Sequence, residues 1–173
     1  MNRAMAGRTD FGRELISGQW AAAEFGALCQ LYGAGVPVPY PVQIVGTELL
    51  LEFIGESSGG RSGATAALRL AQVRRDTADL EDLWLQLVEA MHLMAQLGFT
   101  HGDLSAYNLL VHDGRLVIID LPQIVDVVAN PQGPTFLARD AQNVATWFAS
   151  HGVTYADGDE LATDLLRTAG VSR

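Results

Sequence analysis

The sequence predicts an α+β chain in which helices alternate with short antiparallel strand hairpins. Three observations predict it. Apolar residues recur at helical spacing in four segments, two pairs of short apolar runs are each joined by a tight-turn signal, and polar residues concentrate in residues 101–120. The 173 residues, 49% of them hydrophobic, suffice for one domain with a packed core.

The first helix is predicted over residues 17–32, with Ser17 as its N-cap and Gly33 as the residue that ends it. Its apolar face is formed by Trp20, Ala27, Leu28 and Leu31. Glu24 falls on the same face. Because an unpaired buried carboxylate is costly, we expect Glu24 to lie at the edge of this face or to pair with another group.

An extended segment and a hairpin follow this helix. The prolines within residues 37–41 exclude a helix there, because proline fixes φ and restricts the residue before it. Two apolar runs, residues 42–45 and 48–54, flank a Gly-Thr pair at 46–47 and predict two strands joined by a tight turn. Residues 56–63, ESSGGRSG, predict a flexible connector between a small first part and a larger second part.

Three further helices are predicted in the second part. Residues 80–97 show the strongest helical spacing, with Asp79 as N-cap and Gly98 just beyond the end. Residues 136–150 and 157–169 give two shorter helices with one apolar face each.

The charge of the chain limits its partners. Eleven basic residues, all of them arginine, stand against 20 acidic ones, giving a net charge of −9 and no lysine. Such a chain lacks the basic patch that binding to nucleic acid or to an anionic membrane requires. The single cysteine, Cys29, excludes an internal disulfide and is expected to be a small buried apolar group. With no signal peptide or membrane span in this sequence, we expect a soluble cytoplasmic protein.

The residues with chemical potential meet at one end of a second hairpin. Strands are predicted over residues 108–111 and 115–119, joined by an Asp-Gly turn. Antiparallel pairing then places Asn108 beside Asp120, and Asp103 lies at the other end of the short loop that leads into Asn108. The alternative, that these side chains only cap turns, remains open at this point.

This oxygen-rich set is typical of a phosphoryl-transfer site. Mg²⁺ takes one or two protein oxygens together with waters and substrate phosphates, which suits Asn108 and Asp120. A carboxylate at Asp103 could then orient the attacking hydroxyl or accept its proton. In an acidic chain without lysine, Mg²⁺ would also be needed to bring in a nucleotide.

The motif HGDLSAYNLL, followed by VIIDLPQ and then FLARDAQNVATWFASHGV, resembles the RIO family of atypical serine/threonine protein kinases over roughly residues 20–152. The resemblance implies a protein-kinase-like fold with a truncated N-terminal lobe, made of one helix and a strand hairpin, and a mainly helical C-terminal lobe. In this scheme residues 1–55 are the residual N-lobe and hinge, residues 56–63 the connector, and residues 64–173 the C-lobe of a single kinase-like domain.

The resemblance also implies roles for residues of the loop. Asp103 would be the catalytic base, and Asn108 and Asp120 the metal ligands. His101 would hold the loop by packing and hydrogen bonding, and Asp140 would anchor it from the following helix.

A second group of roles concerns the nucleotide. Leu51 takes the gatekeeper place, and the backbone of Glu52 and Ile54 would face the adenine. Glu24 resembles the glutamate of the regulatory helix of kinases, and Ser105, within the matched motif, supports the loop. The implied reaction is ATP-dependent and Mg²⁺-dependent phosphoryl transfer to a protein hydroxyl, or slow ATP hydrolysis.

Two departures leave alternatives open. The lysine that pairs with the helix glutamate and holds the nucleotide phosphates is absent, as is the nucleotide-binding loop, so the chain is a fragment, a divergent kinase or a pseudokinase that acts as a binding module. The segment after Asp120 leads directly into the next helix, with no long activation segment. This keeps open a small-molecule phosphotransferase of the aminoglycoside or choline kinase type.

Overall fold

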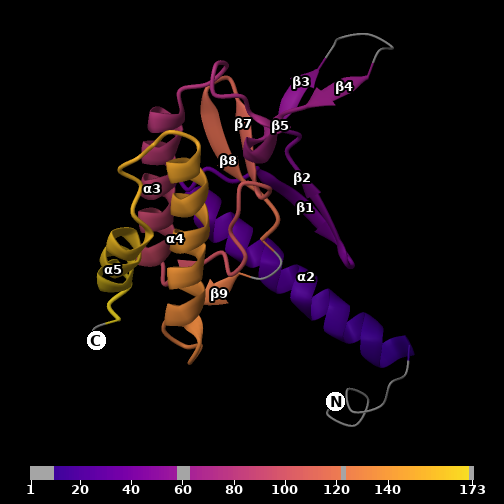
Figure 1. The fold of residues 1–173 in the computed structure, drawn as a ribbon. Coiled ribbons are helices and arrows are strands. Elements are labelled where there is room, and N and C mark those ends of the chain that lie inside the picture. Colours follow the sequence, from indigo (N-terminus) through magenta and orange to yellow (C-terminus); the bar gives the residue numbers. More distant parts are fainter. Residues whose placement is uncertain (1–9, 58–62, 122–123, 172–173) are drawn as a thin grey trace.

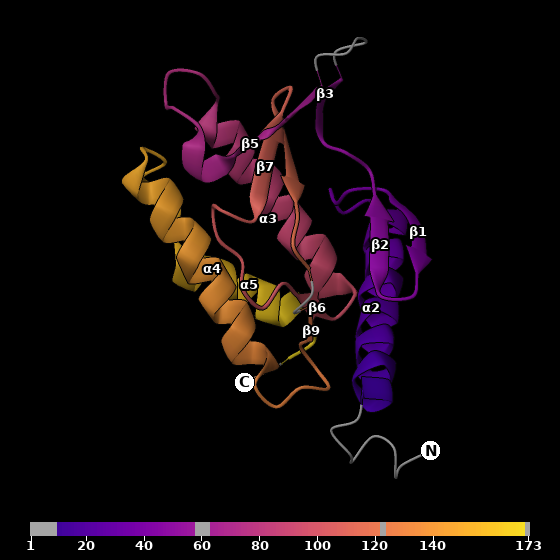
Figure 2. The same ribbon diagram turned by 90° about the vertical axis from the view of Figure 1, so that its right-hand side faces the viewer.

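The computed structural model describes residues 10–57, 63–121 and 124–171. Helix α2, Asp10–Gly33, and the hairpin of β1, Pro41–Val45, and β2, Glu48–Leu51, lie together on one side of the molecule (Figure 1). On the other side, helices α3, Leu80–Gln96, α4, Gly133–Ser150, and α5, Gly158–Thr168, pack against one another. Figure 2 shows β7 and α3 between α4 and the α2 side.

Helix α2 begins earlier than the predicted residue 17. The prediction was right for Leu28 and Leu31, which are buried, and wrong for Trp20, which is 75% exposed. Figure 2 shows that the N-terminal half of α2 extends past the β1–β2 hairpin. Cys29, expected to be buried, is also exposed, because it lies next to the packed face of the helix rather than on it.

The first hairpin is confirmed, but its second strand is shorter than predicted. β1 and β2 pair antiparallel with Ile44 opposite Leu49, and Gly46 has the positive φ of 62° that the tight turn requires. β2 ends at Leu51, not at residue 54. A further hairpin that the sequence analysis missed follows, in which β3, Gly55–Ser57, pairs with β4, Ala64–Ala66. The predicted connector therefore starts as a strand; its residues 58–62 lie outside the described residues.

The core of the molecule lies between α3, α4 and α5 and the second hairpin. The predicted N-cap of α3 is confirmed, since the Asp79 carboxylate accepts the backbone N–H groups of Glu81 and Asp82. The three helices and the hairpin bury large side chains against one another, among them Leu87, Leu137, Phe148 and Leu165 from the helices and Leu109 and Ile118 from the hairpin. Helix α4 begins at Gly133, before the predicted start, with a proline in its first turn.

The second hairpin belongs to a three-stranded sheet in the order β5, β7, β8. β5 is Leu68–Arg69 and leads into a 3₁₀ turn, η1, Leu70–Gln72; β7 is Leu109–His112 and β8 is Arg115–Ile118. Both turn residues, Asp113 with φ 50° and Gly114 with φ 73°, adopt the left-handed conformation of a type I′ turn. The pairing predicted from the Asp-Gly signal is confirmed, with strand limits shifted by one residue.

A small pair of strands closes the base of the helical part. β6, Phe99–Thr100, follows α3 and pairs with β9, Val125–Asp126. This pairing joins the chain just before the polar segment 101–120 to the chain just after it. In the part of the chain that the structure describes, no helix is long and apolar enough to cross a membrane.

Candidate active site

The open end of the β7–β8 hairpin brings Asn108 and Asp120 together. The N–H of Ile119 donates to the carbonyl of Asn108 at 2.9 Å, which continues the strand pairing past Leu109 and Ile118 at the open end of the hairpin. Asp120 follows at once with an exposed side chain and a φ of 64°. Since a non-glycine residue pays for this left-handed conformation, the backbone at Asp120 holds local strain of the kind found at functional sites.

The loop between Asp103 and Asn108 is closed by hydrogen bonds of Asn108. Its side-chain Nδ2 donates to the carbonyl of Asp103 at 2.9 Å, and its backbone N–H donates to the carbonyl of Ser105 at 2.9 Å. Ser105 also accepts the N–H of Tyr107 on its Oγ, at 3.3 Å. Within the described residues nothing donates to Oδ1 of Asn108, which leaves this oxygen available as a ligand. The carboxylate of Asp103 is exposed.

His101 joins the loop to the strand end. The ring is 1% exposed, its Nε2 lies 3.0 Å from the carbonyl oxygen of Ile119, and its Nδ1 lies 3.3 Å from the backbone nitrogen of Asp103. A carbonyl only accepts and an N–H only donates, so Nε2 carries the proton and Nδ1 accepts. The neutral ring therefore connects the residue before Asp120 with Asp103 itself.

Asp140 holds the same loop from α4. Its carboxylate is fully buried: Oδ2 accepts the hydroxyl of Thr100 at 2.8 Å and the N–H of Gly102 at 2.7 Å, and Oδ1 accepts the N–H of Leu104 at 2.9 Å. Three donors from five consecutive residues thus meet one carboxylate, and this fixes the backbone on both sides of Asp103.

Two side chains of α4 that were not predicted from the sequence hold the same loop. A guanidinium nitrogen of Arg139 donates to the carbonyl of Gly102, and Nδ2 of Asn143 donates to the carbonyl of Leu104 at 3.3 Å. The signal in the sequence was their spacing: Asn143 lies four positions after Arg139 and three after Asp140, and residues at these spacings are neighbours on one side of a helix.

Helix α2 brings Glu24 close to Asp120. Burial raises the pKa of the Glu24 carboxyl, and the negative charge of Asp120 raises the pKa further. Glu24 was expected either at the edge of the apolar face of this helix or paired with another group. The structure agrees with the first expectation, because the side chain is only partly buried. It makes no ion pair within the described residues.

The predicted hinge is extended and partly occupied by bonds within the protein. The backbone of Glu52 donates to the carbonyl of Tyr40 at 2.9 Å, while its carboxylate accepts the N–H of Tyr40 at 3.0 Å. The carbonyl of Ile54 accepts the N–H of Ala67 at 3.0 Å. Among the described residues, the carbonyl of Glu52 and the N–H of Ile54 remain without a partner. Leu51 is half-buried against the core.

The fold is that of known kinases. The structure matches the crystal structure of the Rio2 kinase–ADP/Mg²⁺–phosphoaspartate complex from Chaetomium thermophilum with a TM-score of 0.66 and 21% identity, over 91% of this chain and 50% of that one. A second crystal structure of Rio2 kinase from the same organism gives a TM-score of 0.65 and 22% identity, over 98% of this chain and 55% of that chain. The molecule therefore has a protein-kinase-like fold of RIO type.

The sequence comparisons give the family. Residues 2–161 match the RIO domain. The chain is 39% identical to the RIO-type serine/threonine-protein kinase Rio1 of Haloferax volcanii over 82% of this chain and 46% of that protein, and 35% identical to the serine/threonine-protein kinase RIO3 of Mus musculus over 79% of this chain and 25% of that protein. The chain belongs to the RIO family, and it spans about half or less of the length of these relatives.

Proposed function

We propose that the chain performs ATP-dependent phosphoryl transfer of the RIO kinase type, with Asp103 as the group that orients the acceptor hydroxyl and takes its proton. One observation carries the proposal: a single buried ring, His101, connects Asp103 to the strand end that bears Asp120, while Asn108 is bonded to both segments. Such positioning is most of what the protein contributes to phosphoryl transfer.

The donor atoms suit Mg²⁺. Asp120 offers an exposed carboxylate and Asn108 an amide oxygen without a partner among the described residues. In that part of the chain no cluster of three or more His, Cys, Asp or Glu could hold a metal. The arrangement therefore favours an ion that needs few protein ligands and completes its shell with water and phosphate oxygens. When bound, Mg²⁺ would neutralise charge on the phosphates.

The adenine would meet the extended segment after β2. The carbonyl of Glu52 and the N–H of Ile54 provide one acceptor and one donor, which is the pair that the edge of an adenine can use. Leu51, which precedes them, packs against the core and would limit the depth of this site. The RIO2 kinase complex from Chaetomium thermophilum, whose fold this chain shares, contains ADP and Mg²⁺.

A second candidate function, nucleotide binding without turnover, is favoured by the absence of lysine from the sequence and by the carboxylate of Glu24, which is close to Asp120 and has no ion-pair partner among the described residues. A site with this charge should hold a nucleotide only together with its metal ion. The third possibility, a small-molecule phosphotransferase, is not favoured, since the relatives are named as RIO-type protein kinases. A protein acceptor, a cytoplasmic location and the division at residues 56–63 remain predictions.

Titration with a fluorescent ATP analogue, with and without Mg²⁺, tests the metal site. Because φ of Asp120 is positive, Asp120→Ala would add backbone strain to the loss of charge, whereas Asp120→Asn removes the charge and tolerates the conformation. We expect Mg²⁺-dependent binding that is weakened in both variants. Equal affinity of Asp120→Asn and the unaltered chain would show that Asp120 is not a ligand.

Turnover tests the proposed base. Asp103→Asn leaves the size of this exposed side chain almost unchanged. The hydrogen bonds of this residue to His101 and Asn108 are made by its backbone, so the variant should retain the fold. We expect loss of phosphoryl transfer and of ATP hydrolysis, with the melting temperature unchanged. Surviving turnover would refute the role of Asp103, and nucleotide binding without any turnover in the unaltered chain would support the second candidate.

A further inference from the structure

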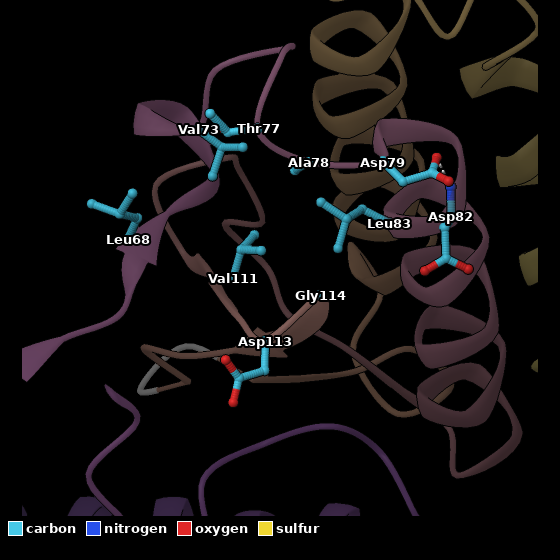
Figure 3. Close-up of a pocket in the computed structure, with 10 residues that line it drawn as sticks. All are labelled: Leu68, Val73, Thr77, Ala78, Asp79, Asp82, Leu83, Val111, Asp113 and Gly114. Carbon is cyan, nitrogen blue, oxygen red and sulfur yellow. Dashed lines mark hydrogen bonds between the residues drawn. The ribbon is translucent and has the colours of Figure 1, made fainter. Parts of the chain in front are cut away.

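A pocket of about 460 Å³ opens between β5, the β7–β8 turn and the start of α3 (Figure 3). Asn108 and Asp120 lie at the opposite end of the same hairpin, about 13 Å away for strands of four residues. The pocket is therefore separate from the candidate active site. Its apolar lining comes from Leu68, Val73, Leu83 and Val111.

Three carboxylates also line the pocket, and none of the residues that line it is basic. Asp79 and Asp82 lie on one side, at the start of α3, and Asp113 lies in the hairpin turn (Figure 3). One oxygen of Asp79 accepts the N–H groups of Glu81 and Asp82, and one oxygen of Asp82 accepts the amide of Gln86. The second oxygen of each carboxylate has no partner among the described residues, so both can accept from a ligand.

The surroundings do not cancel this negative charge. Arg74 pairs with Asp76 at 3.3 Å, and Arg75 donates to a carbonyl at the end of α4. Nε2 of His112 lies 3.6 Å from the carboxylate of Asp113. The N-terminus of α3 contributes about half a positive charge, which is less than the charge of the carboxylates around it.

The strand β5 borders the pocket through Leu68. β5 is an outer strand of its sheet, and within the described residues no strand pairs with its free side, although the N–H of Arg69 already donates to the side chain of Gln72 at 3.1 Å. Leu68 is 55% exposed at this edge, whereas the next side chain, Arg69, donates to the carbonyl of Tyr107 instead. An exposed edge beside an apolar pocket is a surface onto which an extended peptide can add.

We propose that this pocket docks an extended segment of a partner protein that places an arginine or lysine beside a leucine-like side chain. The apolar side chain would lie on Leu68, Leu83 and Val111, and the cation would meet Asp79 and Asp82. Charge complementarity selects this occupant: a pocket with apolar walls, three carboxylates and no cation favours a basic and apolar segment over an acidic or a purely apolar one.

The test uses a fluorescent peptide, Arg-Arg-Ala-Leu-Ala-Leu, and measures its anisotropy with the full chain in the absence of nucleotide. The result is thus independent of the proposed phosphoryl transfer. Two control peptides carry glutamine in place of both arginines, or glycine in place of both leucines. We expect saturable binding of the first peptide that falls with salt, and at least tenfold weaker binding of each control.

A triple variant, Asp79→Asn, Asp82→Asn and Asp113→Asn, removes the charges with little structural change. Asparagine is as good an N-cap as aspartate and tolerates the positive φ of Asp113. We expect about tenfold weaker peptide binding, which corresponds to about 1.4 kcal/mol. Leu68→Ala, at an exposed position, should weaken binding without affecting folding.

A matched control changes three aspartates of the α5 region, Asp157, Asp159 and Asp164, to asparagine, which alters the net charge of −9 by the same amount. It should bind the peptide like the unaltered chain. An equal loss in this control would reduce the effect to overall charge and overturn the proposal. The proposal would also be overturned if the peptide did not bind at about 1 mM, or if the glutamine peptide bound equally well. Displacement of the peptide by an equal concentration of free arginine amide would indicate a small-cation site and would overturn it too.

Discussion

Replacing Asp140 by asparagine tests whether one buried carboxylate holds the loop around Asp103. The carboxylate accepts three donors on two oxygens: the hydroxyl of Thr100 and the N–H of Gly102 on one, and the N–H of Leu104 on the other. An amide has only one accepting oxygen. Whichever way it is oriented, its NH₂ group faces a backbone N–H, either that of Leu104 or that of Gly102.

The expected cost follows from this geometry. A buried donor left without an acceptor costs about 1–3 kcal/mol, and the remaining bonds lose their charge assistance, about 1 kcal/mol each. Relief of the buried charge offsets part of this. We expect Asp140→Asn to lower the free energy of unfolding by about 3 kcal/mol, which for a chain of this size is about 10 °C in melting temperature.

Urea denaturation followed by circular dichroism measures this difference, and Asp126→Asn is the matched control. Asp126 also accepts two backbone N–H groups, those of Val128 and Ala129, but both reach the same oxygen and the residue is exposed. Its amide can therefore keep both bonds, and the change should cost less than about 0.5 kcal/mol. If Asp140→Asn were no more destabilising than Asp126→Asn, the argument from unpaired buried donors would be refuted.

Two further predictions concern α2 and α4. Because the pKa of the Glu24 carboxyl is raised in the folded state, the folded chain binds more protons than the unfolded chain between the ordinary pKa of this group and its raised pKa, and stability falls as pH rises through that range. Glu24→Gln should therefore be more stable than the unaltered chain at pH 7 and equally stable at pH 4, as measured by thermal melting in EDTA. The same difference in melting temperature at both pH values would contradict this reasoning. Gly133→Ala should destabilise by about 1–3 kcal/mol in urea, since its Cβ would lie 2.6 Å from the backbone Cα of Val127, whereas Gly26→Ala, in open space within α2, should stabilise by about 0.5–1 kcal/mol. A tolerated alanine at 133 would mean that the start of α4 can shift freely.

The parts of the fold that could be predicted from sequence are those with local signals. The Asp79 cap, the Asp-Gly turn and the spacing within residues 80–97 depend on neighbours along the chain, and all three predictions are confirmed. Trp20 and Cys29 were placed wrongly because their exposure depends on what packs against α2, and periodicity does not contain that information. The β3–β4 hairpin was missed since its strands are short and lack apolar alternation.

For the site, sequence could predict which residues meet but not what holds them. The pairing of Asn108 with the strand end before Asp120 follows from the turn alone, and the structure brings these residues together. The bonds from Arg139 and Asn143 link α4 to a loop far away in sequence. The spacing of Arg139 and Asn143 indicates that they share one side of α4, but it does not indicate which distant loop they contact. The end of the LPQ motif, at Gln123, lies outside the described residues.

The buried ring of His101 has a consequence for how variation in this family can be tolerated. Because one rigid planar group spans the gap between the Ile119 carbonyl and the Asp103 amide, it acts as a spacer of fixed length between the two halves of the site. A shift of the strand end is transmitted to the loop rather than absorbed by a flexible side chain. Substitutions near Ile119 and near Asp103 should therefore be energetically coupled, so that a change harmful on one side is rescued by a matching change on the other.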